Sequence, residues 1–315
     1  MSLSPATRPT MYFFGVSTGK SSINKVFPAW SQYLGLDATL SGLDFPPDDD
    51  PKNYRKAVAF VKDDPLSLGG LVTTHKVNLF KASRALFDEL DPFARTLGEV
   101  SCLSKRDGRL MGHAKDPITV GAALKTLLPP DHFSTTGGEM VILGAGGSAL
   151  ALTLHLHQRH QSGADTPKAI TVTAIAEQDI SEMRKIHGAL GFGPAIRYVL
   201  TPTPAEADAL VSALPAGSMV VNATGLGKDR PGSPLTDAAR FPEGGIAWEF
   251  NYRGDLTFLH QARSQAGARG LTVSDGWVYF VHGWTRVIAE VFHVEIEMEG
   301  PRFDALSKIA QDATS

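Results

Sequence analysis

The sequence predicts an α/β protein built from two domains. Its 315 residues are enough for two domains of ordinary size. Apolar runs of strand length alternate with stretches of helix length, and a stretch rich in Pro, Ser, Thr and Gly, residues 129–138, divides this alternation in two. We therefore expect an N-terminal domain over residues 1–128 and a second domain over residues 129–276. The C-terminal helices, about 277–315, should pack back on the first domain.

The first series of elements opens with apolar runs that are typical of buried strands: residues 11–16, 38–45 and 68–74. A stretch with helical spacing follows each run: residues 23–34, a Pro- and Asp-rich start continuing to about 62, and residues 77–90. This order indicates a parallel sheet with helices on its faces. Residues 98–112 differ, because two short strands flank a turn signal at 105–108 and predict a hairpin. A helix over about 117–128 completes the series.

The second series again alternates strands and helices. Its predicted strands are residues 139–143, 169–175, 196–200, 219–224 and 246–252. Its predicted helices run from the turn after the first strand to about 158, then over 181–190, 205–214, 256–268, 277–292 and 302–311. The repeated order predicts a second parallel sheet.

Composition and charge restrict the function classes. A net charge of −3 argues against a nucleic-acid or membrane-surface role, since both usually need a basic face. The single cysteine, Cys102, permits no intrachain disulfide and fits a cytoplasmic protein, and no signal peptide or membrane span is evident. His155, His157 and His160 have a mixed helical spacing, so we expect them at a helix surface and expect no metal. A monomer or homodimer acting on a small molecule fits this composition.

A glycine-rich loop is the strongest local signal. An apolar strand runs straight into it, and a helix rich in Ala and Leu leaves it. In this setting glycines permit a tight turn and a close approach to a pyrophosphate, while the helix N-terminus offers free N–H groups. We therefore expect a Rossmann-type dinucleotide-binding loop formed by Gly144, Ala145, Gly146, Gly147, Ser148 and Ala149. A turn without ligand, a flavin site or an S-adenosylmethionine site are the alternatives that the loop leaves open.

Two further segments bear on the cofactor. Residues 173–179, after the second strand of this series, hold no Arg or Lys, and Glu177 could bind ribose hydroxyls, which slightly favours NAD over NADP. Glu177 could equally be a helix N-terminal acid. Small residues at the carboxyl end of a later strand would let a cofactor ring lie against the backbone: Asn222, Ala223, Thr224 and Gly225. An ordinary strand-to-loop transition is the alternative for this segment.

Other segments complete a pattern over nearly the whole chain: a Ser-rich loop after Gly15, a Val-Thr strand end leading to a Lys at 71–76, Gly segments at 98–102, 112–116 and 276–283, and the pair 249–252 and 257–259. In this order they resemble the shikimate dehydrogenase family. That family has Gly-Ala-x-Asn-Thr where this chain has residues 98–102, and Gly-x-Asn-Thr-Asp where it has 112–116. We place His282 at the position of the family's late Gln.

The resemblance implies an α/β substrate-binding domain, a Rossmann-type domain and a cleft between them. It implies hydride transfer between NAD or NADP and a secondary hydroxyl of a cyclic polyol acid, in the shikimate pathway of aromatic amino acid biosynthesis. It assigns catalysis to Lys76 and Asp116, and adds Gly276 to the cofactor site. It assigns substrate binding to Ser17, Ser21, Ser22, Thr73, Thr74, Ser101, Tyr252 and His282.

The chain departs from the family pattern mostly where the family holds its substrate. Ser101 replaces an Asn, Ala114 and Lys115 replace Asn-Thr, and His282 replaces the Gln. The first loop lacks the usual Ser-x-Ser-Pro, and the Asn-Arg-Thr that reads NADP is absent. The exact substrate therefore stays open, with quinate a candidate beside shikimate. A non-enzymatic NAD(P)-binding regulator and, more weakly, a methyltransferase are the alternative functions.

Lys76 and Asp116 also have an interpretation that needs no family. Lys76 follows a strand whose polar end, Thr73-Thr74, interrupts the apolar run, so its ammonium could point into a cleft. A lysine acts as a base only if its pKa falls toward neutrality, whereas a paired Asp116 would keep it charged as a proton donor or anchor. The alternatives are a solvated lysine and an aspartate that caps the helix starting at Pro117.

Overall fold

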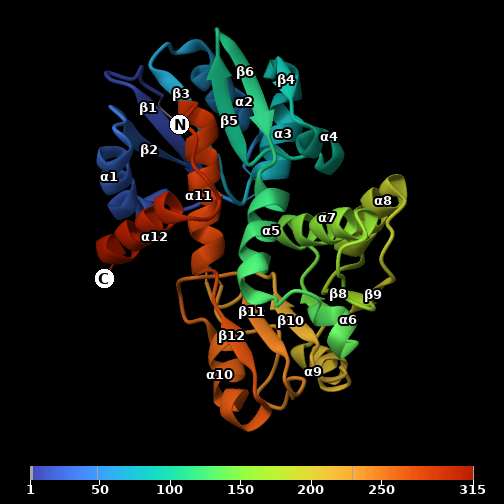
Figure 1. Cartoon of the computed structure of the whole chain (residues 1–315). Coiled ribbons are helices and arrows are strands. Elements are labelled where there is room, and N and C mark those ends of the chain that lie inside the picture. The colour runs from blue at the N-terminus through green and yellow to red at the C-terminus, as the bar shows by residue number, and fades with distance from the viewer. Residues whose placement is uncertain (1–2, 48, 229, 315) are drawn as a thin grey trace. The chain divides into compact units, whose positions relative to one another are not determined.

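The computed structural model describes residues 3–47, 49–228 and 230–314, and its chain forms two compact units (Figure 1). Unit 1 comprises Met1–Thr119 and Val281–Ser315, and unit 2 comprises Val120–Phe280. The chain passes between the units within α5 (Asp116–Leu127) and α11 (Trp277–Phe292). The domain limits expected at residues 128 and 276 stay a prediction.

Unit 1 contains a six-stranded sheet with the order β2-β1-β3-β5-β6-β4. Its first three strands pair in parallel, as the strand–helix order predicted: β1 (Thr10–Gly15), β2 (Thr39–Asp44) and β3 (Ser67–Val72). The expected hairpin is β5 (Cys102–Arg106) and β6 (Arg109–His113), which pair antiparallel with Arg106 opposite Arg109. Its turn is therefore only Asp107 and Gly108, whose positive φ values of 52° and 75° fit a type I′ turn.

The helices of unit 1 are α1 (Ile23–Leu34), α2 (Pro51–Asp63), α3 (Lys76–Ser83), α4 (Pro92–Leu97) and α12 (Pro301–Thr314), with part of α5 and α11. The indole N–H of Trp30 in α1 donates to the carbonyl of Leu306 in α12 at 2.8 Å. The last helix therefore packs on the first one, and segments far apart in the sequence share one core.

The predicted helix over residues 77–90 is wrong in its second half. α3 ends at Ser83, and a 3₁₀ turn (Arg84–Leu86) and strand β4 (Glu89–Leu90) follow it. The carboxylate of Asp88 accepts the backbone N–H of Leu110 at 2.7 Å, and β4 pairs with β6. These long-range bonds outweigh the local helical spacing, as tertiary contacts often do.

Unit 2 contains six parallel strands in the order β12-β11-β10-β7-β8-β9. Their bounds are β7 (Met140–Leu143), β8 (Ile170–Ala174), β9 (Ile196–Leu200), β10 (Met219–Asn222), β11 (Ile246–Glu249) and β12 (Thr272–Ser274). The chain adds strands on one side of β7 and then returns to add the rest on the other side. The order therefore reverses between β7 and β10, which is where open α/β sheets bind ligands.

The helices of unit 2 are α6 (His132–Thr136), α7 (Gly147–Gln161), α8 (Glu177–Leu190), α9 (Pro204–Ser212) and α10 (Thr257–Arg269), with the remaining parts of α5 and α11. A core of buried apolar side chains, among them Val211, Phe241 and Phe258, joins α9 and α10 to the sheet. No helix of the described residues is long and apolar enough to cross a membrane.

The stretch 129–138, interpreted as a boundary, holds α6 and lies within unit 2. The carboxylate of Asp165 accepts the N–H groups of Phe133 and Ser134, each at 2.8 Å. The side chain of His132 forms a hydrogen bond with the carbonyl of Gly217 at 2.7 Å. A segment with the composition of a linker is thus ordered by partners distant in the sequence.

The surface position expected for the three histidines of α7 is also wrong for two of them. His157 is only 4% exposed, and its ring stacks on Phe192 at 5.4 Å. The ring of His155 lies over Gly121 of α5, so closely that a side chain at residue 121 would collide with it. Only His160 is exposed, because α7 buries more than one face.

Candidate active site

Lys76 and Asp116 are brought together in unit 1. Strand β3 ends at Val72, Thr73 donates its N–H to the carbonyl of Phe14 at 3.0 Å, and α3 begins at Lys76. Asp116 begins α5 shortly after β6. The ammonium of Lys76 donates to the carboxylate Oδ2 of Asp116, and the two side chains are 17% and 13% exposed. Lys76 is therefore a half-buried, paired residue and not the solvated lysine of the alternative interpretation.

The pair is held in its ionised form. Burial lowers the pKa of Lys76, but the Asp116 carboxylate and the nearby Glu99 outweigh burial and raise that pKa above its ordinary value. Lys76 is thus an ammonium at neutral pH, which excludes it as a free base and fits a proton donor or hydrogen-bond anchor.

Glu99 is a component of this site that the sequence analysis missed. It lies between α4 and β5, is 1% exposed, and its Oε1 has no hydrogen-bond partner among the described residues. Burial raises the pKa of Glu99 to about 7, and Lys76 lowers it while Asp116 raises it. A signal was present, because a lone carboxylate interrupts the largely apolar segment around Leu97, Val100 and Leu103.

The loop expected to hold the substrate lies at the carboxyl edge of the same sheet. Thr18 donates its N–H to the carboxylate of Asp44, at the end of β2, at 2.7 Å. A Cβ built on Gly15 would lie 3.1 Å from the methyl group of Thr18 and 3.2 Å from that of Thr73. The loop after β1 and the end of β3 are therefore side by side. The predicted hydroxyl residues there are Ser17, Ser21, Ser22 and Thr73, all half-buried, and the exposed Thr74.

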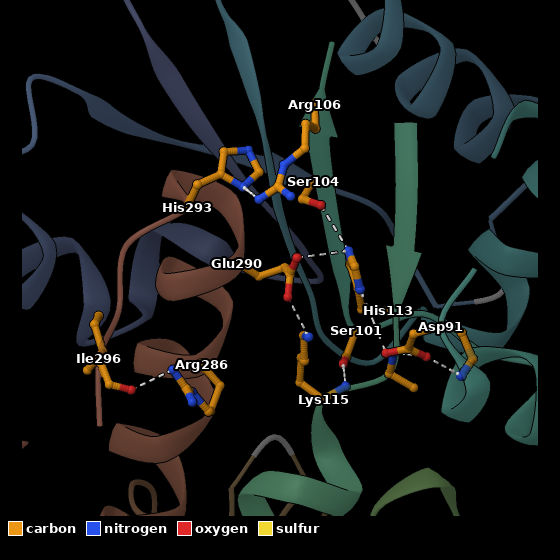
Figure 2. A network of polar contacts seen from close by, with 12 residues as sticks. Asp91, Ser101, Ser104, Arg106, His113, Lys115, Arg286, Glu290, His293 and Ile296 are labelled. Atoms are coloured by element: carbon orange, nitrogen blue, oxygen red, sulfur yellow. Dashed lines mark hydrogen bonds and ion pairs between the residues drawn. The ribbon is translucent and has the colours of Figure 1, made fainter. Parts of the chain in front are cut away.

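Ser101 is placed differently from the open hydroxyl that was expected. It is buried, and its Oγ accepts the backbone N–H of Lys115 at 2.8 Å. The ammonium of Lys115 in turn donates to the carboxylate of Glu290, on α11, at 2.7 Å (Figure 2). Two positions at which the chain departs from the family pattern are therefore engaged with the protein itself.

His113 extends this polar network. Its ring lies between the carboxylates of Asp91, at 3.7 Å, and Glu290, at 3.5 Å, and bonds to the hydroxyl of Ser104 at 2.9 Å (Figure 2). Burial and the neighbouring Lys115 lower the pKa of His113, against the opposing effect of the carboxylates. The network lies at the end of β6, shortly before α5 begins at Asp116.

The substrate-binding role predicted for His282 does not fit the structure. Its ring is 1% exposed and stacks on Phe303 of α12 at a centroid distance of 4.2 Å. Burial and the adjacent Arg286 lower the pKa of His282 to about 4, so the ring is neutral. His282 is a core residue of unit 1, because the buried face of α11 that packs on α12 includes it.

The glycine loop of unit 2 has the geometry that a dinucleotide site needs. Gly144 follows β7 with a φ of +103°, which favours glycine, and donates its N–H to the carbonyl of Thr173 at 3.0 Å. A Cβ at this position would lie 3.0 Å from the methyl group of Thr224 and 3.2 Å from the backbone of Ala223. The loops after β7 and β10 therefore meet where the strand order reverses.

The start of α7 completes the loop. Gly146 is its N-cap and offers no side chain to bond the first N–H groups, while Gly147 begins the helix. Ala145, Gly147 and Ser148 are half-buried, Gly146 is exposed and Ala149 is fully buried in the core. A helix N-terminus of this kind, approached through small residues, fits a phosphate group.

Asn222, at the end of β10, stabilises the loop that follows this strand. It is 0% exposed, its Nδ2 donates to Glu249 at 2.6 Å, and its Oδ1 accepts the N–H and hydroxyl of Thr224 at 3.0 and 2.6 Å. Both ends of the Asn222 side chain are therefore bonded within the protein, and its expected contact with a cofactor stays a prediction. Ala223, Thr224 and the exposed Gly225 are the residues that Asn222 presents.

Glu249 is the second buried carboxyl, after Glu99, that was not among the residues expected in the site. Its carboxylate also accepts the side-chain and backbone N–H groups of Asn251, at 2.6 and 2.8 Å. Burial raises the pKa of Glu249 to about 7 against the lowering effect of these hydrogen bonds. It joins the ends of β10 and β11.

The remaining candidates also lie in unit 2. Glu177 is an exposed residue that opens α8, and its carboxylate is 3.5 Å from the guanidinium of Arg184. The helix therefore brings a base to the region that appeared free of basic residues in the sequence. A Cβ on Gly276 would collide with the carbonyl of Phe250, so this glycine permits a close approach of two backbones. Tyr252 is half-buried against Phe280 at 4.3 Å.

Comparisons with known proteins agree with this architecture. No family model matches the chain. A shikimate dehydrogenase (NADP(+)) of Symbiobacterium thermophilum is 30% identical over 253 residues, 79% of this chain and 76% of the relative. A protein of the same name in Methylocella silvestris is 30% identical over 281 residues, 88% of each chain.

Solved structures match over almost the full length. The 5-ketofructose reductase of a Gluconobacter strain has a TM-score of 0.69 at 19% identity, covering 97% of this chain and 98% of its own. The quinate dehydrogenase of Corynebacterium glutamicum, in complex with NAD, has a TM-score of 0.70 at 18% identity, covering 97% and 99%. These likenesses confirm the predicted fold class, an α/β domain followed by a Rossmann-type domain. Together with the sequence relatives, they show that the chain belongs to the shikimate dehydrogenase family.

Proposed function

We propose that this protein is an NAD(P)-dependent oxidoreductase that interconverts a secondary alcohol and a ketone on a cyclic polyol acid such as shikimate or quinate. The observation that carries the proposal is the half-buried Lys76–Asp116 ion pair, which follows the end of β3, where Thr73 adjoins the hydroxyl-rich loop of unit 1. The family relatives, named shikimate dehydrogenase (NADP(+)), support it. Unit 2 adds a loop suited to a dinucleotide, because Gly144 has no Cβ and so leaves open the space beside Ala223 and Thr224.

The chemistry that this chain contributes is proton transfer and positioning. A bound nicotinamide would supply the hydride acceptor for alcohol oxidation and the hydride donor for ketone reduction. The Lys76 ammonium would donate a hydrogen bond to the reacting oxygen and, in reduction, give it a proton. Asp116 would hold that ammonium in place, and in oxidation its carboxylate would accept the hydroxyl proton, relayed through Lys76.

The substrate would be held by a set of side chains unlike the family pattern. Ser17, Ser21, Ser22, Thr73 and Thr74 would bind the hydroxyls and carboxylate of the acid. The Ser101 hydroxyl accepts the backbone N–H of Lys115, and the Lys115 ammonium donates to Glu290, which leaves both side chains less able to bind substrate. We therefore propose a relative of shikimate, with quinate as the first candidate. The substrate-binding role of Tyr252 stays a prediction.

The choice of cofactor depends on the end of β8. We propose a slight preference for NAD, because the exposed carboxylate of Glu177 would repel a 2′-phosphate. Two observations oppose it, since the sequence relatives are named for NADP(+) and Arg184 lies 3.5 Å from Glu177. The preference therefore rests on Glu177 alone.

The test is an absorbance assay of reduced cofactor, with NAD and NADP each combined with shikimate, quinate and related hydroxy acids. The proposal predicts turnover of at least one acid, and its loss in a Lys76→Ala variant prepared in parallel. Retained NAD(P) binding with no turnover across the panel would instead support the regulator. Tight binding of S-adenosylmethionine without nicotinamide binding would support the methyltransferase.

We also propose a cytoplasmic monomer or homodimer. The only cysteine, Cys102, is buried and unpaired, which suits a reducing compartment. Light scattering of the purified chain would give the oligomeric state directly, and a stable higher oligomer would contradict this part of the proposal.

A further inference from the structure

Glu99 occupies an unusual place for a carboxylate. It follows Gly98, which ends α4 in a left-handed conformation, and precedes Val100, whose N–H points to the carbonyl of Lys76 at 3.4 Å. Its backbone therefore runs beside the start of α3. The side chain is 1% exposed, and Oε1 has no hydrogen-bond partner in the part of the chain that the structure describes.

A buried carboxyl without full hydrogen bonding is destabilising unless a nearby charge compensates it. The charged groups that act on Glu99 are Lys76 at the start of α3 and Asp116 at the start of α5. One ammonium thus faces two carboxyls. When two carboxyls share one site, the less well bonded of them binds a proton more readily. Asp116 is bonded to Lys76, so Glu99 is the one that changes charge.

A purely structural explanation accounts poorly for this residue. An alanine would fill the position without burying a charge, and the family pattern Gly-Ala-x-Asn-Thr has alanine there. Glu249, the other buried carboxyl of raised pKa, is anchored by Asn222 and Asn251. The interactions of Glu99 are instead mainly with the charges of the candidate active site.

We propose that Glu99 is a positioning residue that sets the proton affinity of Lys76, which rests on the catalytic role proposed for that lysine. Ionised Glu99 holds Lys76 firmly as an ammonium. Protonated Glu99 leaves only Asp116 to stabilise that charge, so the ammonium gives up its proton more easily. Since the pKa of Glu99 is raised to about 7, the change between these two states falls near neutral pH.

The effect on Lys76 can be measured without turnover. Competitive labelling with acetic anhydride across pH 7 to 11, read by mass spectrometry of the peptide containing Lys76, reports the fraction of neutral amine. Two charges several ångströms apart in a partly buried site interact by an amount that corresponds to about one pKa unit or more. Glu99→Gln should therefore lower the pKa of Lys76 and speed its labelling about tenfold at a given pH below that pKa.

Controls separate this effect from general disturbance. Glu89→Gln removes an exposed carboxylate of the same unit, paired with Arg109, and should leave the labelling of Lys76 unchanged. Glu99→Ala serves as the second variant if Glu99→Gln fails to fold, with circular dichroism confirming the fold of each protein. Labelling curves that superimpose on the wild type in the folded Glu99 variants would overturn the proposal. Because no substrate is used, that failure is distinct from failure of the proposed function.

Discussion

The candidate site of unit 2 is formed mainly by backbone, whereas that of unit 1 is formed by side chains. In unit 2 the loop after β7 consists of backbone and small residues, and Gly144 has a φ of +103° that favours glycine. In unit 1 the site consists of side chains, Lys76, Asp116 and Glu99. A backbone site constrains the sequence strongly, whereas a side-chain site can exchange residues on an unchanged fold. This difference fits a chain that matches the family pattern at the glycine loop and departs from it in the segments expected to hold the substrate.

The two buried carboxyls sharpen the same contrast. Both Glu99 in unit 1 and Glu249 in unit 2 have a pKa raised to about 7 by burial. The oxygens of Glu249 accept hydrogen bonds from Asn222 and Asn251, which fix loop geometry. Glu99 keeps an oxygen without a hydrogen-bond partner among the described residues and faces an ion pair. Glu249 stabilises the shape of a loop, and we propose that Glu99 stabilises the charge of Lys76.

Replacing Lys76 by alanine should have the largest effect. Loss of a proton donor at the reacting oxygen should reduce kcat by roughly a thousandfold. Cofactor binding should be unchanged, because the nucleotide loop lies in unit 2. Steady-state kinetics and a fluorescence titration with cofactor would measure both quantities. Lys81→Ala, on the exposed face of the same helix, is the matched control, and a comparable loss there would contradict a specific role for Lys76.

Replacing Gly144 by alanine tests the backbone site. The new Cβ would strain a backbone with φ of +103° and press on Ala223 and Thr224, so cofactor affinity should fall by about ten- to a hundredfold, about 1.4 to 2.8 kcal/mol. Calorimetric titration would measure it. Gly163→Ala is the control: it strains a backbone with a φ of +70° away from the loop and should leave cofactor affinity unchanged. Equal affinities for the Gly144 variant and the wild type would show that the loop does not hold the cofactor.

Acid should destabilise the protein through buried histidines. Burial lowers the pKa of His187 to about 4, so the folded state binds fewer protons than the unfolded state between pH 6.5 and 4. Stability should therefore be complete above pH 6.5 and lost as the pH falls toward 4, by about 2 kcal/mol at pH 5 for this residue. Urea unfolding at several pH values would show it.

A variant isolates this contribution. His187→Gln removes the titrating ring that lies between Thr153 and Tyr198, so it should flatten the dependence of unfolding free energy on pH. His260→Gln, on an exposed position of α10, should not. Glu99 and Glu249 act in the opposite sense, since their raised pKa values cost stability as the pH rises from 4.5 through 7. If the unfolding free energy of the His187 variant depends on pH as strongly as that of the wild type, His187 is not the source of the acid destabilisation.

The smallest effect concerns the cofactor phosphate. Glu177→Gln should raise kcat/KM with NADP relative to NAD by about three- to tenfold, because one repulsive charge is removed at an exposed site. Arg184→Ala should shift the ratio the other way. Glu182→Gln, an exposed acid on the same helix, is the control. If none of these variants changes the ratio, α8 does not determine the cofactor.

The sequence predicted the elements whose signals are local. The glycine loop, the hairpin turn at Asp107–Gly108 and the strand leading to Lys76 each follow from residue type and spacing. What it missed depends on distant partners: α6 is ordered by Asp165, and β4 by pairing with β6. The burial of His282 was not foreseen, because helical position alone does not reveal that Phe303, from another helix, covers the ring. Glu99 was overlooked because its significance comes from proximity to Lys76 in space.

Deuterium transfer tests the central claim most directly. The protein would be mixed with cofactor reduced and deuterated at C4 of the nicotinamide, prepared separately on each face, and with the keto form of shikimate or quinate. We expect a product with one deuterium on the carbon that bears the new hydroxyl, from one cofactor face only, and a roughly thousandfold slower transfer with Lys76→Ala. Cofactor binding without deuterium in any product would contradict it.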